Sequence, residues 1–187
     1  KESSAASDVY KRQSATSVAY VMYQKFVNAM PLYRLEKEWK NLGLNLSRAT
    51  MANWIMIASK EWLNPIVEEM HRILLKEKYL HADETTVQVM KEAGRKNTTK
   101  SYMWVYGSYR ESKTPIRIFE YRPTRSGENA DKFLKGFKGY LISDAYQGYN
   151  KVEGVTRCYC WAHLRRYFVD AMPEDVKETT APQQAIE

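Results

Sequence analysis

The spacing of apolar residues divides the chain near residue 79 into a helical part and a mixed part. Before residue 79, apolar residues recur at helical spacing in four stretches. Pro31 suits the first turn of the second helix, Gly43 suits its end, and Ser47 suits the cap of the third. The Asn64-Pro65 pair predicts a break before the fourth helix. We therefore predict a helical region over residues 1–78.

From residue 79 onward, alternating and β-branched stretches predict three strands, a helix, two more strands and a final helix. The expected strands cover residues 79–90, 101–109, 115–121, 139–143 and 155–160. Ser126 is the expected cap of the first helix, and the final helix covers residues 162–171, with Leu164, Phe168 and Met172 facing inward. The pattern predicts a mixed α/β (α+β) domain over residues 79–172.

Two aspartates each follow a short apolar run that predicts a buried strand. Asp83 follows the run from Tyr79 to Ala82, and Asp144 follows the run from Gly139 to Ser143. A buried carboxylate is costly unless its charge is compensated, and a divalent metal held between neighbouring strands would compensate two of them. Spacing alone favours the alternative of two strand-end or turn aspartates that accept backbone N–H groups.

Six short sequence words around these aspartates occur in a fixed order. They are HADET (81–85), KSYMWVY (100–106), RSGE (125–128), GFKGYL (136–141), DAYQGY (144–149) and CWAHLRR (160–166). Together they resemble the catalytic domain of the insertion sequence 66 family of bacterial transposases. The similarity extends upstream through residues 31–34 and 46–54, so it covers most of the chain.

The resemblance implies a DDE transposase with an RNase H-like core, which cuts DNA at transposon ends and transfers the cut strand to target DNA. It implies a site with two divalent metals, Mg²⁺ or Mn²⁺, in which Asp83 is the first catalytic acid and metal ligand and Asp144 the second. The third acid, a Glu, belongs in the family to a helix beyond a helical insertion. The acids near the end of the chain stand outside that context: Glu174, Asp175, Glu178 and Glu187. We expect residues 173–187 to begin the insertion or form a flexible tail, and the chain to be an inactive fragment.

The charge distribution favours a nucleic-acid partner. The chain carries a formal net charge of +7, and residues 91–166 hold 16 Lys and Arg against 7 Asp and Glu. Such a basic region suits contact with phosphates, although many folded domains are mildly basic. The resemblance further implies a homo-oligomer on DNA and a cytoplasmic, nucleoid-associated location. No apolar run approaches the length of a membrane span, so no membrane partner is expected.

Several residues are candidates for DNA contact. Arg48 and Asn53 stand near the start of the third helix, where a helix-turn-helix would meet the major groove, although plain helix packing explains them equally well. The other candidates lie in the family words: Arg125, His163, Arg165 and Arg166. For the arginines, the alternative is a solvated surface position.

Two further features border the candidate site. Strand alternation places Glu84 on the opposite face from Asp83, which predicts a supporting or structural role. Cys158 and Cys160 are poorly spaced for a disulfide within a strand, which fits a reducing compartment. With His163 they form a Cys-x-Cys-x-x-His pattern, but a fourth zinc ligand is not evident.

Two other functions fit part of this pattern. Another RNase H-like nuclease, such as a resolvase or integrase, would share the aspartate pair but not the six words. A non-catalytic DNA-binding protein would use the helical part and keep the mixed part as a scaffold, and it would have no reason to bring Asp83 and Asp144 together.

Overall fold

The computed structural model describes residues 14–172 of the chain, which forms two compact units. The first unit ends at Glu68 and the second begins at Glu69. Among the described residues, none of the helices has both the length and the apolarity that crossing a membrane requires. The predicted boundaries of 1–78, 79–172 and 173–187 stay predictions, and the last segment and its acids lie outside the described residues.

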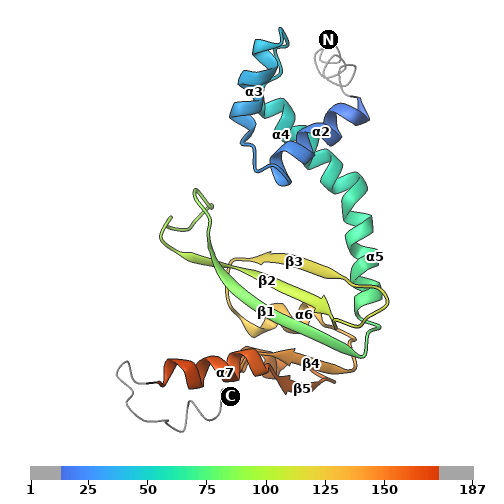
Figure 1. The fold of residues 1–187 in the computed structure, drawn as a ribbon, viewed down its shortest axis with the longest axis vertical. Coiled ribbons are helices and arrows are strands. Elements are labelled where there is room, and N and C mark those ends of the chain that lie inside the picture. The colour runs from blue at the N-terminus through green and yellow to red at the C-terminus, as the bar shows by residue number, and fades with distance from the viewer. Residues whose placement is uncertain (1–13, 173–187) are drawn as a thin grey trace. The chain divides into compact units, whose positions relative to one another are not determined.

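The first unit contains three helices around a small apolar core (Figure 1): α2 (Ala15–Phe26), α3 (Leu32–Asn41) and α4 (Arg48–Ala58). Ser47 caps α4 as predicted, because its side chain accepts a hydrogen bond of 3.1 Å from the backbone N–H of Thr50. The buried side chains of this core are Val18, Val21, Leu35, Met51, Trp54 and Ala58.

The fourth helix begins at Asn64 as predicted, but the predicted break before it is wrong. A π-helical turn, η1 (Ser59–Leu63), follows α4 directly and leads into α5 (Asn64–Leu74). The N–H of Asn64 bonds to the carbonyl of Ser59, and Asn64 keeps right-handed helical dihedrals of φ −59° and ψ −45°. Pro65 is tolerated because it stands in the first turn of α5, where the missing N–H costs little. A Pro signal therefore marked a change of helical pitch here, not an end.

The second unit is built on a five-stranded mixed sheet, and the predicted fold class is confirmed. Its strands are β1 (Tyr79–Gln88), β2 (Lys100–Ser108), β3 (Arg117–Arg122), β4 (Tyr140–Ser143) and β5 (Thr156–Tyr159). Their order across the sheet is β3-β2-β1-β4-β5 (Figure 1). The first three strands are antiparallel, whereas β4 pairs parallel to β1 and β5 parallel to β4. This arrangement is consistent with the RNase H-like fold.

One face of the sheet carries the core of the second unit. Leu80 and Ala82 of β1 point into it, beside Trp104 and Tyr106 of β2. Buried side chains from the end of α5, from α6 (Gly127–Phe133) and from η2 (Gln147–Lys151) complete this core: Leu74, Ala130, Phe133 and Tyr149.

The last described helix, α7 (Trp161–Asp170), contradicts one expectation. None of its residues is buried, and Leu164, which we expected to face inward, is 40% exposed. Phe168 and Met172, which we also expected to face inward, are half-buried. The spacing of its apolar residues predicted the helix correctly, but the described part of the chain covers this stripe only in part.

Candidate active site

The pairing of β1 with β4 brings the two aspartates to one level of the sheet. The strands run parallel, and their register ends with His81 opposite Ile142. Asp83 lies two residues after His81, and Asp144 lies two residues after Ile142. Neighbouring strands lie about 4.8 Å apart, so the two backbones are adjacent where β4 ends. The topology therefore supplies the juxtaposition that a shared site requires.

Asp83 lies on the open face of the sheet. Its side chain is 52% exposed, so the expectation of a buried carboxylate is wrong for this residue. The reason is alternation along β1, which buries Leu80 and Ala82 and turns Asp83 outward. Oδ1 of Asp83 accepts a hydrogen bond of 2.9 Å from the N–H of Glu84. Oδ2 lies 4.0 Å from Nε2 of His163 on α7, close enough for an ion pair when the imidazole is protonated.

Asp144 is held more tightly. Its side chain is 19% exposed, and Oδ1 accepts a hydrogen bond of 3.0 Å from the N–H of Tyr146. Arg157 of β5 donates to the Asp144 carbonyl at 2.7 Å and to the Ser143 hydroxyl at 2.8 Å. Oδ2 accepts no hydrogen bond from residues 14–172, and its nearest cationic atom is Nη2 of Arg125 at 3.6 Å. One oxygen of Asp144 is thus left available.

Glu84 points to the other side of β1, as alternation predicted, and its side chain is only 1% exposed. Nε of Arg125 donates to Oε1 at 2.7 Å, Nη2 of Arg125 forms an ion pair with the same oxygen at 2.6 Å, and the Tyr149 hydroxyl donates to Oε2 at 2.6 Å. Burial raises the pKa of Glu84, and the hydrogen bonds from Tyr149 and Arg125 oppose this shift. Burial and the hydrogen bond to Glu84 together raise the pKa of Tyr149.

Arg125 stands between Glu84 and Asp144. Its guanidinium lies 4.1 Å from the centre of the Tyr146 ring, and the Tyr146 hydroxyl donates to the Arg125 carbonyl. Burial disfavours the cation, yet the hydrogen bond and charge of Glu84 leave the pKa of Arg125 raised. The side chain remains 43% exposed, so contact with a phosphate stays a prediction, although Nε and Nη2 already contact Glu84.

The remaining predicted DNA contacts are placed on exposed helix surfaces. Arg165 and Arg166 are exposed on α7, which also carries His163. Arg48 and Asn53 are exposed on α4, away from the buried Met51 and Trp54 of the same helix. His163 is 26% exposed, and its Nδ1 is buried without a hydrogen-bond partner among the described residues. These positions leave each residue accessible but do not test its role.

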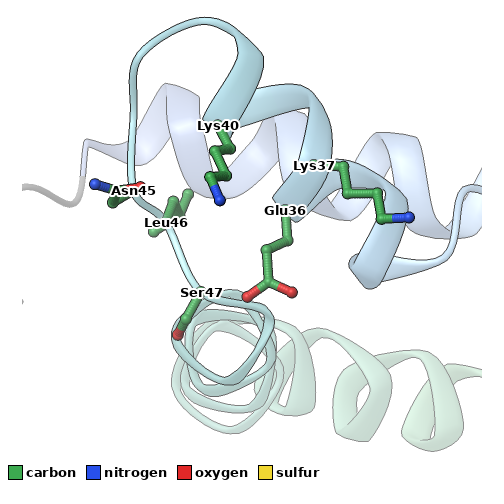
Figure 2. Close-up of a pocket in the computed structure, with 6 residues that line it drawn as sticks. All are labelled: Glu36, Lys37, Lys40, Asn45, Leu46 and Ser47. Carbon is green, nitrogen blue, oxygen red and sulfur yellow. The ribbon is translucent and has the colours of Figure 1, made fainter.

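A depression of about 390 Å³ lies beside the start of α4 in the first unit. Figure 2 shows Glu36 pointing from α3 toward the start of α4, where Oε1 accepts a hydrogen bond of 3.0 Å from the Arg48 N–H. Lys37 and Lys40 of α3 border the same depression. Because a carboxylate already occupies the first turn of α4, a second anion would have to bind beside it instead of on the helix end.

The carboxylates of Asp83 and Asp144 supply some, but not all, of the ligands that a hard divalent cation requires. Among residues 14–172, no three His, Cys, Asp or Glu side chains are grouped closely enough to hold a metal ion. Asp83 and Asp144 still offer carboxylate oxygens, and Mg²⁺ is often bound by one or two carboxylates with water completing its shell. Cys158 and Cys160 are both free thiols, and with His163 they form no metal-binding group in this part of the chain.

Sequence reasoning left Tyr146 and Tyr149 without individual roles. Both lie in the DAYQGY word, two and five residues after Asp144. Their hydroxyls bond to residues 21 and 65 positions away in the chain, namely Arg125 and Glu84. The available signal was the repeated tyrosine at a fixed distance from an acid, but nothing in that spacing identifies the partner.

The chain is similar to three proteins of Sinorhizobium fredii that are named as uncharacterized proteins. It is 29% identical to protein y4qI over 167 residues, a match that covers 82% of this chain and 31% of that protein. It is 28% identical to protein y4hP, covering 82% of this chain and 29% of that protein, and 26% identical to protein y4jD, covering 88% and 34%. The chain thus spans about a third of the length of these relatives, and no solved structure matches it significantly. The sequence profile described as "Transposase IS66 family" matches residues 11–187, and the chain belongs to this family of transposases.

Proposed function

We propose that the full-length protein is a DDE transposase that cleaves DNA at transposon ends and joins the cut strand to target DNA. The observation that carries this proposal is the parallel pairing of β1 with β4, which ends two residues before Asp83 and Asp144, in a chain of a transposase family. The three acids of the family pattern then include these two, with the third outside residues 14–172.

The chemistry divides between a metal and the side chains that hold it. Asp83 and Asp144 would hold one or two divalent ions, Mg²⁺ or Mn²⁺, which when bound supply Lewis-acid stabilisation for phosphodiester cleavage. Asp144 is oriented for this role by the Tyr146 N–H and by Arg157. His163 lies beside Asp83 and is available to balance its charge or to contact DNA.

Cleavage by the full-length protein tests the two acids. Asp83→Asn and Asp144→Asn keep side-chain shape and remove charge, so each should reduce metal-dependent cleavage of a transposon-end duplex to background while circular dichroism stays unchanged. Asp131→Asn on α6 is the matched control and should cleave like wild type. Full cleavage by a folded Asp83→Asn protein would exclude Asp83 as a metal ligand.

DNA binding should involve both units of the chain. The exposed Arg48 and Asn53 of α4 suit contact with a groove, and the exposed Arg165 and Arg166 of α7 suit contact with phosphates near the acids. Removing one phosphate contact should lower the salt dependence of binding by about one unit of slope. An Arg165→Ala chain with an unchanged slope would remove that residue from the interface. Assembly into a homo-oligomer on DNA is part of the same proposal and is measured by sedimentation with and without duplex.

A further inference from the structure

Glu84 and Arg125 form a charge pair beside the proposed metal ligand Asp144. The carboxylate of Glu84 accepts one hydrogen bond from Arg125 and one from Tyr149, forms an ion pair with Arg125, and is almost completely buried. A buried carboxylate without partners would be costly, and these contacts offset part of that cost.

The distances around Arg125 are unequal. Nη2 lies 2.6 Å from Oε1 of Glu84 but 3.6 Å from Oδ2 of Asp144. The first is a close ion pair, reinforced by the 2.7 Å hydrogen bond from Nε of Arg125 to the same oxygen, whereas the second distance is beyond hydrogen-bond range. Arg125 is therefore bound to Glu84, and the Asp144 oxygen that it faces accepts no hydrogen bond from residues 14–172.

The contacts around this pair fix the backbone of Arg125 beside Asp144. A Cβ on Gly127 would lie 2.2 Å from the carbonyl oxygen of Gly148, so the start of α6 and the turn after Asp144 are in direct backbone contact. Tyr146 bonds to the Arg125 carbonyl and lies under its guanidinium. The RSGE and DAYQGY words thus pack against each other and hold Arg125 between Glu84 and Asp144.

We propose that Glu84 is a positioning residue that holds Arg125 away from Asp144 and so keeps an Asp144 oxygen available for a divalent cation. The inference rests on the proposed function, because it assigns Glu84 a role in the same metal site. Without the Glu84 charge, Arg125 is drawn the short distance to Asp144 and pairs with it directly. The arginine then competes with the metal for that oxygen.

Manganese binding by the 187-residue chain tests this role, with Mn²⁺ alone as the probe and titration calorimetry as the readout. Glu84→Gln is nearly isosteric and its amide oxygen can still accept hydrogen bonds, so it should fold. It should weaken Mn²⁺ binding about 10- to 100-fold, the range seen when groups behind a metal ligand are removed. Arg125→Met should bind at least as tightly as wild type, and the double variant should match Arg125→Met.

These variants separate positioning from a merely structural role. A structural Glu84 would lower stability and leave Mn²⁺ affinity unchanged, which would overturn the proposal. A double variant as weak as Glu84→Gln would overturn it too, because the loss would not pass through Arg125. Asp144→Asn, in which the proposed ligand loses its charge, gives the affinity expected when this oxygen does not contribute.

A second measurement needs no metal and keeps the inference separate from the proposed function. The coupling between Arg125 and Asp144 is obtained from urea unfolding of Arg125→Met, Asp144→Asn and the double variant. This cycle is run once in the wild-type background and once in the Glu84→Gln background. The coupling should be small in the first background and clearly larger in the second. Equal coupling energies in the two backgrounds would refute the positioning role. If the coupling energies differ but the wild-type chain binds no Mn²⁺, the result would count only against the metal site of this chain.

Discussion

Replacing Tyr149 with phenylalanine removes a single hydroxyl from the pocket around Glu84. The Tyr149 side chain is fully buried, and its hydroxyl donates to Oε2 of Glu84 at 2.6 Å. A hydrogen bond to a charged group contributes about 1.5–3 kcal/mol, and its loss leaves a buried carboxylate oxygen without its donor. We expect Tyr149→Phe to destabilise the second unit by about that amount. The ring is kept, so its edge-on contact with Trp104 is unchanged.

Tyr106→Phe is the matched control. Tyr106 is equally buried, but its hydroxyl has no hydrogen-bond partner among the described residues. Its ring stacks on Phe133 with the centroids 3.7 Å apart, a contact that phenylalanine also makes. Removing an unpaired buried hydroxyl costs almost nothing and can stabilise the fold, so we expect a change within about 0.5 kcal/mol or a gain.

Hydrogen exchange of β1 and β2 peptides in a urea series measures both variants within the second unit alone. This readout avoids assuming that both units unfold together. If Tyr106→Phe lowers the stability of the second unit as much as Tyr149→Phe, the loss cannot be attributed to the hydrogen bond with Glu84. The prediction also fails if Tyr149→Phe is as stable as wild type, since the Glu84 carboxylate would then not depend on this donor.

Three further changes test local features of the fold. Gly127→Ala should cost about 3 kcal/mol or more by thermal unfolding, because its Cβ meets a backbone oxygen. The hydrogen bond from Tyr121 is the largest of the contacts that lower the pKa of Glu92, so this group stabilises the fold above its ordinary pKa of 4.5 and loses that contribution as the pH falls through the lowered value. The stability difference between wild type and Glu92→Gln should therefore shrink in acid unfolding below pH 4.5, and a constant difference would contradict the assignment. Ser47→Ala should cost about 1 kcal/mol through the lost cap of α4, and Ser47→Asp should restore it.

Alternation and chain order were enough to predict the sheet. Short apolar runs before Asp83 and Asp144 predicted two neighbouring strands, and the structure pairs those strands in parallel. The same alternation placed Glu84 on the opposite face from Asp83. What the pattern could not supply was the partner of Glu84, because Arg125 and Tyr149 come from positions 41 and 65 residues away. A periodic pattern gives the side of a strand on which a residue lies, but the side chains that meet it there depend on tertiary packing.

The failures have a similar origin. Proline suggested a break at residue 65, but a π turn one step earlier absorbs the change and the helix continues. Apolar spacing suggested a buried stripe on α7, but burial depends on a covering surface that periodicity does not contain. Asp83 was expected to be buried because apolar residues precede it, although only every second position of β1 faces the core.

Asp83 and Glu84 are adjacent acids on opposite faces of β1, so the face that each acid occupies depends on its exact position along the strand. Inserting or deleting one residue between Leu80 and Asp83 would turn the following side chains over, placing the aspartate toward Arg125 and the glutamate toward the open face. After such a one-residue change, the shorter aspartate would not reach as far into the pocket around Arg125, and the longer glutamate would extend beyond the level of Asp144. An insertion or deletion of two residues would instead leave each acid on its original face. The effect of an insertion or deletion in this segment should therefore depend on whether the number of residues is odd or even. An odd number should abolish the site, and an even number should shift it along the sheet.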